Sequence, residues 1–503
     1  MYYLGIDIGT TNLKAVLVND RFEIAAEESA SYGLRFLEGG GVEQNPDDWW
    51  RGVRAAVGSL GRRGIPLHEI RSLAVSGHGC ALVAIDREGH PLRQAISSLD
   101  TRCSMQTEQI RQMSAAQIEE INGNGVGAFN FEPKLLWIKQ NEPEFYDRMS
   151  CFLSPTSYVN YRFTGNRVMN VSDGGIAMAY HRKEGGRWSN DIIACLGLDP
   201  DKFPALAKCE EVIGTVTREA AAATGLPAGI PVLAGGEDTS SAALAMGVTL
   251  PGMAYLSMGT QCTVGVCTDR FTTCRELLGF PHVLPGQHLI NGSMSTCGGG
   301  INWFVNEWCR DLSEKCESKD QVFAMLMDEV KHTLPGAMGL LFLPYLSGEL
   351  HPILDATARG VFFGLKLEHV RGDMARAVME GSAHAIKHNL DFAESVAGGV
   401  SELRAVGGPA KSEVWCQAIA DITGKPVKIM GKDGSFGGAA LGDAILAMGA
   451  IEHASVDSLA ERFLHIEREY VPNESSREMY ERQHIVYKRL YMQLKELYPL
   501  LTS

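Results

Sequence analysis

Residues 3–11 read YLGIDIGTT, a short apolar segment that carries one aspartate and ends in a glycine and two threonines. The apolar run over residues 2–8 predicts a buried strand. The Gly-Thr-Thr turn after it can present backbone N–H groups and hydroxyls to an anion, because glycine lets the backbone approach without a side chain in the way. Asp7, just before the turn, could hold Mg²⁺ and so offset phosphate charge. A hairpin turn with a buried, hydrogen-bonded aspartate explains this segment equally well when it is taken alone.

A similar opening recurs in the second half of the chain. Residues 253–261 read MAYLSMGTQ, which again predicts a strand that runs into a Gly-Thr turn. Residues 13–18 and 262–267 then read as the returning strands of the two segments. The second half continues with predicted strands over 403–406 and 427–430 and predicted helices over 412–423 and 437–448. We therefore predict two α/β domains that face one another across a cleft, with a boundary near residues 247–252, where Pro251-Gly252 marks a loop.

Length and composition limit the class of protein. A chain of 503 residues is too long for one compact core, which favours two domains. The net charge of −14 argues against a nucleic-acid surface or an anionic membrane as partner, since either needs clustered basic side chains. The 12 cysteines include no C-x-x-C pair, so neither zinc nor a disulfide framework is expected. Because the N-terminus lacks a signal-peptide pattern and no apolar stretch reaches membrane-spanning length, we expect a cytoplasmic protein. The charged run over residues 461–469 predicts a solvated helix face.

Two further glycine-rich segments favour a phosphate site over a plain hairpin. Residues 405–412 read AVGGPAKS, a strand, a glycine pair and a helix start, where glycine allows close approach of an adenine or a ribose. By itself this turn is as readily structural. Residues 233–240 read LAGGEDTS and place Asp238 close behind a glycine pair. Asp238 could be a helix N-cap, which aspartate favours, and a helix N-terminus inside a cleft is also a good phosphate site.

Taken together, these segments resemble the FGGY family of carbohydrate kinases, and the resemblance extends over nearly the whole chain. The segments that carry it, in the order of the family, are GIDIGTTNLKAV from Gly5, EPKLLWIKQNEPE from Glu132, AGGEDTSSA from Ala234, YLSMGTQ from Tyr255, LFLPYLSGE from Leu341, GVFFGLKLEHVRGDMARAVMEG from Gly360 and AVGGPAKSEVWCQAIADITGKPV from Ala405. The resemblance implies a ribonuclease H-like (actin-like ATPase) fold in both domains. It assigns sugar binding and the catalytic base to residues 1–246 and ATP binding to residues 247–503.

The resemblance also implies roles for individual residues. Asp238 matches the catalytic base, which accepts the proton of a substrate hydroxyl as that hydroxyl attacks the γ-phosphoryl group of ATP. Asp7 matches the position that holds Mg²⁺. The residues expected to contact the nucleotide are Thr10, Thr11, Asn12, Gly259, Thr260, Gly298, Gly407, Gly408 and Ser412. ATP and Mg²⁺ are therefore the expected cofactors.

The residues expected at the sugar are His78, Gly79, Cys80, Asp100, Arg102, Asp238 and Thr239. Residues 76–80 stand where xylulokinases carry a Gln-Met-His-Gly run, with Cys80 opposite their histidine. This loop looks closer to that of L-xylulose and erythritol kinases. Phe131 and the segment 348–352 also depart from the common family pattern. His78 could bind a sugar hydroxyl or be a packing histidine. Asp100 and Arg102 could hold vicinal hydroxyls or could pair with each other.

The leading hypothesis is ATP-dependent phosphorylation of a small sugar, most simply a ketopentose such as xylulose. Other acceptors considered are erythritol, glycerol and gluconate. Two readings from other classes are an actin-like ATPase and a non-catalytic sugar sensor. Retention of Asp7, Asp238 and both Gly-Thr turns argues against the sensor. By analogy with related kinases, a homodimer is expected.

Overall fold

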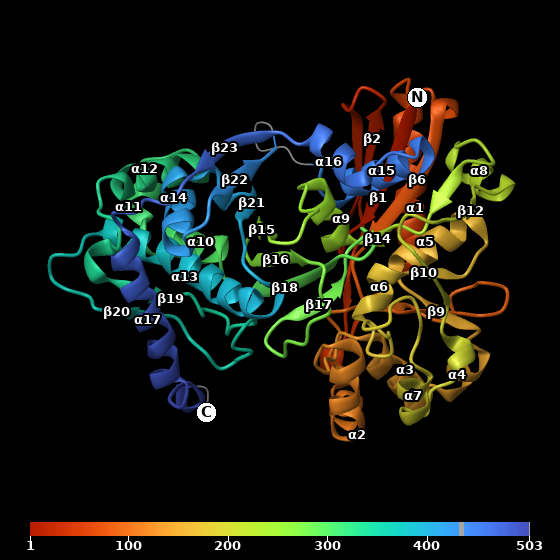
Figure 1. The fold of residues 1–503 in the computed structure, drawn as a ribbon, viewed down its shortest axis with the longest axis horizontal. Coiled ribbons are helices and arrows are strands. Elements are labelled where there is room, and N and C mark those ends of the chain that lie inside the picture. Colours follow the sequence, from red (N-terminus) through yellow and green to blue (C-terminus); the bar gives the residue numbers. More distant parts are fainter. Residues whose placement is uncertain (432–436, 502–503) are drawn as a thin grey trace.

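The computed structural model describes residues 1–431 and 437–501, which form two lobes side by side (Figure 1). The first lobe is built on a sheet with strand order β12-β13-β6-β1-β2-β3, in which β14 also pairs with β6. Its strands are β1 (Tyr2–Ile8), β2 (Asn12–Asn19), β3 (Ile24–Ser31), β6 (Ile70–Gly77), β12 (Val212–Thr215), β13 (Pro231–Leu233) and β14 (Gly236–Glu237). Its helices are α1 (Pro46–Arg62), α2 (Ser104–Asn122), α3 (Phe131–Asn141), α4 (Pro143–Arg148), α5 (Pro155–Thr164), α6 (Val171–Ile176), α7 (Asn190–Cys195), α8 (Arg218–Thr224) and α9 (Asp238–Ala245).

The second lobe repeats this sheet. Its strand order is β17-β18-β16-β15-β21-β22-β23, so the hairpin β15-β16 corresponds to β1-β2, and β21 lies parallel to β15 as β6 lies parallel to β1. Its strands are β15 (Met253–Met258), β16 (Cys262–Thr268), β17 (Leu278–Pro281), β18 (His288–Met294), β21 (Glu402–Gly407), β22 (Val427–Met430) and β23 (Ile466–Tyr470). Its helices are α10 (Gly298–Trp308), α11 (Arg310–Ser313), α12 (Lys319–Lys331), α13 (Arg371–Ala397), α14 (Glu413–Thr423) and α17 (Arg477–Leu494). The predicted pair of ribonuclease H-like α/β folds is confirmed.

Short strands extend both lobes beyond the two main sheets. In the first lobe, α2, α3, α4 and α7 lie below the sheet in Figure 1, and they pack around an apolar cluster that also includes Tyr255, Cys267 and Phe280 of the second lobe. The short strands are β4 (Arg35–Phe36), β5 (Val42–Gln44), β7 (Val83–Ile85), β8 (Ala95–Ile96), β9 (Cys151–Leu153), β10 (Val168–Asn170), β11 (Ala205–Ala207), β19 (Leu341–Leu343) and β20 (Val361–Phe363). All 12 cysteines are free thiols, most of them buried.

A helix from the second half of the sequence lies on the first sheet. Helix α15 (Gly438–Glu452) packs on β1, β2 and β6 and against α9, while α16 (Val456–Phe463) follows it. The approach is so close that a Cβ at Gly5 would lie 1.8 Å from the carbonyl oxygen of Ala440, and one at Gly442 would lie 1.9 Å from that of Ser241. Only glycine permits so close an approach. Through α15, the second half of the sequence packs directly on the sheet formed by the first half. The ranges 1–246 and 247–503 stay a prediction of domain limits.

One predicted element is wrong. The charged run over residues 461–469 is not a single helix face, because α16 ends at Phe463 and residues 466–470 form the edge strand β23. This strand pairs antiparallel with β22, and its Glu-Arg-Glu side chains are exposed. Charged side chains protect a sheet edge from pairing with another chain, which explains the composition without a helix.

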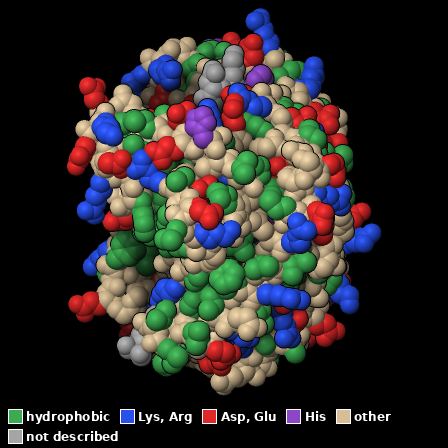
Figure 2. All heavy atoms as spheres, turned by 90° about the vertical axis from the view of Figure 1, so that its left-hand side faces the viewer, with side chains coloured by type: hydrophobic (Ala, Val, Ile, Leu, Met, Phe, Trp, Pro, Cys, Tyr) green, Lys and Arg blue, Asp and Glu red, His purple; other side chains and the backbone are tan. Residues whose placement is uncertain are grey.

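The outer face of the second lobe exposes apolar side chains between charges of both signs (Figure 2). Leu334, Phe363 and Leu367 are among the large apolar residues exposed in this lobe. The segments around Met338 and Lys366 lie together, since Lys366 Nζ donates to the Met338 carbonyl at 3.4 Å. Within the described residues, no helix combines the length and the apolar character needed to cross a bilayer.

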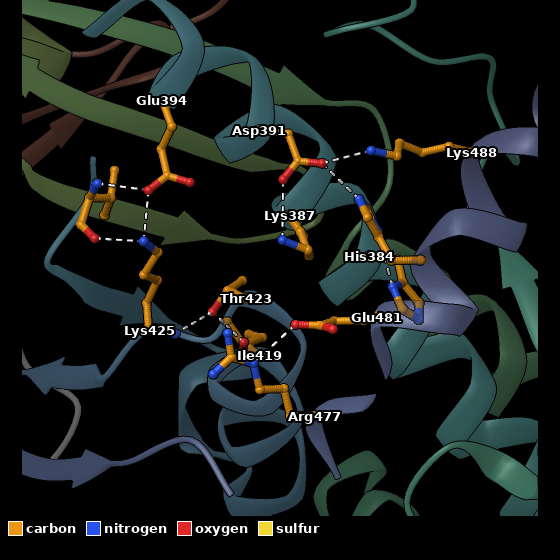
Figure 3. Close-up of polar contacts among 12 residues, drawn as sticks. His384, Lys387, Asp391, Glu394, Ile419, Thr423, Lys425, Arg477, Glu481 and Lys488 are labelled. Atoms are coloured by element: carbon orange, nitrogen blue, oxygen red, sulfur yellow. Dashed lines mark hydrogen bonds and ion pairs between the residues drawn. The ribbon is translucent and has the colours of Figure 1, made fainter. Parts of the chain in front are cut away.

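A half-buried polar cluster holds α17 against α13 (Figure 3). Asp391 accepts from His484 Nε2 at 3.0 Å and forms ion pairs with Lys488 at 2.9 Å and Lys387 at 3.2 Å. Burial opposes ionisation of Asp391, but these contacts hold its pKa well below the ordinary value. The contacts of Asp391 are all made within the cluster, which indicates that the cluster serves to hold the C-terminal helix.

Candidate active site

Three neighbouring strands of the first sheet end at the same edge. Strand β6 pairs in parallel with β1 on one side and β14 on the other, so that Ser76 stands opposite both Asp7 and Gly236. His78 follows β6, and Asp238 follows β14. Neighbouring strands are about 4.8 Å apart, which places these side chains around one narrow site. The carboxyl ends of parallel strands are where open α/β sheets bind ligands.

Asp7 is the carboxylate at the end of β1. Its Oδ1 is buried and has no hydrogen-bond partner among the residues that the structure describes. Burial and the neighbouring charge of Asp238 raise the pKa of Asp7 well above the ordinary value. A cation beside Asp7 would supply the missing partner and favour the ionised form. The residue therefore fits a position at which Mg²⁺ is held.

Two side chains donate hydrogen bonds to the carbonyl groups of the Gly-Thr-Thr turn in the first lobe. The Tyr32 hydroxyl donates to Gly9 O at 2.5 Å, and Gln44 Nε2 donates to Thr10 O at 2.7 Å. Thr11 and Asn12 are exposed, with Asn12 Nδ2 donating to the Thr11 hydroxyl at 3.0 Å. Fixing the carbonyls on one side leaves the exposed side of the turn for a ligand.

Asp238 is the first residue of α9, and it is not the N-cap. The cap is Glu237, whose Oε2 accepts from Ser240 N–H at 3.1 Å. The alternative in which Asp238 caps the helix is therefore wrong, and its partly exposed carboxylate stays available at the helix N-terminus. The chain reaches this position through Gly235, which has φ +73° and whose Cβ would lie 1.8 Å from Val75 O. Only glycine fits there.

His78 is both packed and open to a ligand. Its Nδ1–H donates to Ile8 O at 2.9 Å, and its ring meets Trp49 edge-on at 5.6 Å between centroids. The Nε2 atom is buried and has no hydrogen-bond partner among the described residues. Burial lowers the pKa of His78, so the ring is neutral and Nε2 carries an unused lone pair. A neutral acceptor of this kind suits a sugar hydroxyl.

Asp100 and Arg102 pair with each other. Arg102 Nε donates to Asp100 Oδ2 at 2.9 Å, and its Nη1 lies 2.9 Å from Glu43 Oε1. Asp100 also accepts from Val42 N–H at 2.6 Å, and the guanidinium lies 5.1 Å from the ring centroid of Trp137. Arg102 Nη2 lies 2.8 Å from Asp100 Oδ2, but it is buried without a hydrogen bond among the described residues. Contact of Asp100 and Arg102 with the sugar stays a prediction.

The loop 76–80 has a buried lysine beneath it that sequence reasoning missed. Lys134 Nζ donates to Cys80 O at 2.5 Å and to Phe129 O at 2.6 Å. Burial lowers the pKa of Lys134, and Cys80 adopts φ +62° above it. The segment from Glu132 that contains this lysine served only as a family marker. The available signal was a lysine directly before the apolar run of residues 135–138.

Two buried carboxyls near the site were also missed. Asp173 Oδ2 accepts from Ser154 Oγ at 2.8 Å and from Asn170 Nδ2 at 3.0 Å, and burial raises its pKa to about 7. Glu132 Oε1 accepts from Ala179 N–H at 2.8 Å. Asp173 Oδ1 and Glu132 Oε2 have no hydrogen-bond partner within the described part of the chain. The first lobe thus offers several unused buried oxygens.

The second lobe places its Gly-Thr turn beside an open cavity. The cavity has a volume of about 560 Å³ and is lined by Ser257, Gly259, Thr260, Gln261, Thr263, Ser295 and Ser347. The start of α10 closes on this turn, where Gly298 N–H donates to Gly259 O at 2.9 Å. A Cβ at Gly298 would lie 2.5 Å from Gly259 O, so the residue must be glycine. Hydroxyls and exposed backbone make this cavity suited to an anion.

The two glycines at the end of β21 have different structural requirements. Gly407 has φ +105°, and its Cβ would lie 1.9 Å from Met258 O on the neighbouring strand. A Cβ at Gly408 would meet nothing within 4 Å. Ser412 caps α14 by accepting from Trp415 N–H at 3.4 Å, so its side chain serves the helix. Nucleotide contacts of Gly408 and Ser412 stay predictions.

The residues described contain no group of three or more His, Cys, Asp or Glu side chains placed to hold a metal ion. A metal at Asp7 would therefore need most of its ligands from elsewhere. Mg²⁺ commonly takes one or two carboxylates from the protein and the rest from substrate phosphates and water. Asp7 alone is compatible with that arrangement.

Comparison with known proteins covers both lobes. The N-terminal domain of the FGGY family of carbohydrate kinases matches residues 2–245, and its C-terminal domain matches residues 254–451. Xylulose kinase of Bacillus subtilis (strain 168) is 30% identical over 510 residues, which cover 100% of this chain and 99% of that protein. Gluconokinase of the same strain is 27% identical over 462 residues, or 89% of this chain and 87% of that protein. The crystal structure of xylulose kinase from Rhodospirillum rubrum superposes with a TM-score of 0.90 and 29% identity, covering 99% of this chain and 100% of that one.

Proposed function

This chain belongs to the FGGY family of carbohydrate kinases, and we propose from that premise that it transfers the γ-phosphoryl group of ATP to a hydroxyl of a neutral ketopentose such as xylulose. The observation that carries the proposal is the convergence of Asp7, His78 and Asp238 at one edge of the first sheet. Xylulose kinases that match this chain over nearly its whole length support the acceptor. Membership of a kinase family sets aside the actin-like ATPase and the non-catalytic sensor.

Asp238 would act as the general base. Its carboxylate accepts the proton of the acceptor hydroxyl while the hydroxyl oxygen bonds to phosphorus and ADP leaves. The helix N-terminus behind Asp238 provides a positive end of a dipole next to the transferring phosphoryl group. Most of the rate enhancement comes from placing the two reactants in line and from excluding water between the lobes.

The nucleotide would lie between the two Gly-Thr turns. Thr10 and Thr11 face it from the first lobe, and Gly259, Thr260 and the cavity beside them face it from the second. A divalent cation bound with ATP would neutralise phosphate charge, and the unpartnered oxygen of Asp7 fits that ion.

The substrate preference can be predicted from charge. Burial and the charge of Asp238 raise the pKa of both Asp173 and Glu237, so the surroundings of Asp238 disfavour any further negative charge. A second carboxylate brought into such surroundings is repelled, which costs several kcal/mol. We therefore expect kcat/KM for xylulose to exceed that for gluconate by at least about tenfold.

The experiment measures ADP release with D- and L-xylulose, erythritol, glycerol and gluconate under the same conditions. Gluconate as the best acceptor would show that the neutral-substrate proposal is wrong. If no sugar or polyol stimulated ADP release above the slow rate in water, the kinase reaction itself would be in doubt.

His78 gives a second test of the sugar side. We expect His78→Asn to raise KM for the sugar by about tenfold, because Asn Nδ2 can still donate to Ile8 O while the Nε2 acceptor is lost. KM for ATP should stay unchanged. His90→Asn is the matched control, since the side chain of His90 is 78% exposed. An unaltered sugar KM in His78→Asn would assign His78 to packing alone.

A homodimer, a cytoplasmic location and the absence of nucleic-acid partners stay predictions. Apolar side chains exposed on the outer face of the second lobe (Figure 2) would favour self-association. Leu334 and Leu367 are among the exposed apolar residues of that lobe.

A further inference from the structure

One hydroxyl links a carboxyl oxygen of the proposed base, Asp238, to a carboxyl oxygen of the neighbouring Glu237. The Thr239 hydroxyl oxygen lies 2.9 Å from Glu237 Oε1 and 3.0 Å from Asp238 Oδ1. A threonine hydroxyl carries a single proton and can donate to only one carboxyl at a time. The second contact at hydrogen-bond distance therefore needs a proton on one of the two carboxyls.

Burial indicates which carboxyl carries that proton. Glu237 is 6% exposed, and its other oxygen, Oε2, accepts from Ser240 N–H at 3.1 Å. Asp238 is partly exposed and lies at the helix N-terminus, which favours a negative charge. Burial, followed by the charge of Asp238, raises the pKa of Glu237 well above the ordinary value. The proton belongs on Glu237 Oε1, which donates to Thr239, while Thr239 donates to Asp238.

The groups around Glu237 reinforce this assignment. Asp173 from α6 adds to the raised pKa of Glu237, and Glu237 in turn contributes to the raised pKa values of Cys80 after β6 and Tyr255 on β15. The amino group of Lys134 on α3 already donates to two backbone carbonyls. Further out, Asp7 and His78 both interact with the charge of Asp238. If Glu237 were ionised as well as Asp238, its charge would be surrounded mostly by acidic side chains.

The loop 76–80 also touches Glu237. A Cβ added to Gly79 would lie 3.4 Å from Glu237 Cγ and 3.6 Å from its Oε1. Glu237 therefore stands between the loop expected to bind the sugar and the residue expected to accept its proton. A carboxyl group in this place can control the orientation of the Asp238 carboxylate.

We propose that Glu237 and Thr239 are positioning residues of the phosphoryl transfer: Glu237 stays protonated and, through the Thr239 hydroxyl, holds ionised Asp238 in the orientation that accepts the substrate proton. This inference rests on the proposed function, with Asp238 as base. At alkaline pH the loss of the Glu237 proton leaves two carboxylates competing for one hydroxyl proton, and the orientation of Asp238 is lost. Turnover then falls as pH rises.

The test is the pH profile of kcat at saturating ATP and xylulose. In Glu237→Gln the amide Nε2–H donates to Thr239 while Oε1 accepts from Ser240 N–H, so the variant copies the protonated side chain and cannot titrate. We expect kcat of the wild type to decline at alkaline pH. We expect this conservative variant to keep kcat at pH 7 within about fivefold of the wild type and to lack that decline. An alkaline decline unchanged in Glu237→Gln would overturn the proposal.

Substitutions at Thr239 provide the second part of the test. Thr239→Val should lower kcat by about 10- to 100-fold, the value of one hydrogen bond to a charged group, with KM for ATP unchanged. Thr239→Ser should restore most of that loss. Equal kcat in Thr239→Val and the wild type would also overturn the proposal.

Thermal unfolding and ATP binding show whether each variant is folded. Asp238→Asn, measured alongside, separates the two levels of failure. If Asp238→Asn is inactive and Glu237→Gln keeps the alkaline decline, only the positioning role fails. If Asp238→Asn turns over normally, the proposed base fails as well.

Discussion

We expect Asp238→Asn to lower kcat by about 10²- to 10⁴-fold while ATP affinity stays close to that of the wild type. The amide has the size of the carboxylate but cannot accept the proton of the attacking hydroxyl. Asp238 lies at the first position of α9 without being its cap, so the substitution leaves the Glu237–Ser240 capping bond in place. The substitution should therefore lower the rate of phosphoryl transfer and leave folding unaffected.

The measurement pairs steady-state kcat from ADP release with the Kd of a non-hydrolysable ATP analogue. Asp269→Asn is the matched control, because the Asp269 side chain is 63% exposed and follows β16 at the end away from the Gly-Thr turn. Near-normal turnover in Asp238→Asn would remove the residue from the role of base. A parallel collapse of ATP binding would indicate a structural cause.

The second large effect is expected at Gly407. Gly407→Ala places a Cβ 1.9 Å from Met258 O in a backbone conformation with φ +105°. Strained backbone of this kind costs about 1–3 kcal/mol, and the steric clash with β15 adds to it. We expect the free energy of unfolding to fall by about 2–4 kcal/mol and ATP affinity to fall at least about tenfold, since Met258 leads directly into the turn at Gly259 and Thr260.

Gly408→Ala is the matched control for this prediction. Its φ of −58° suits alanine, and the added Cβ meets nothing within 4 Å. Thermal stability should stay at the wild-type value, while ATP affinity falls if Gly408 lies against the nucleotide. Wild-type stability in Gly407→Ala would contradict the close approach of β21 and β15. Unchanged ATP affinity in Gly408→Ala would remove Gly408 from the nucleotide site.

Local pattern predicted much of the fold. The strands of both hairpins, the two Gly-Thr turns and the helix over 412–423 lie close to where periodicity and turn residues place them. The error at residues 461–469 has a physical cause, because exposed charges suit an edge strand as well as a solvated helix. The cap of α9 was misplaced by one residue for a similar reason, since Glu237 and Asp238 can both accept from a backbone N–H.

The sequence by itself determined the repeated strand–turn unit and the two Gly-Thr turns, because each depends on residues that are neighbours along the chain. Only the tertiary structure decided which residues share the site. It brought Asp7, His78 and Asp238 to one sheet edge, paired Asp100 with Arg102, and placed Lys134 beneath the loop 76–80. It also exposed the shared hydroxyl of Thr239. Strand order and helix packing join segments far apart in sequence, and local periodicity carries no information about which distant segment fills the space beside a given side chain.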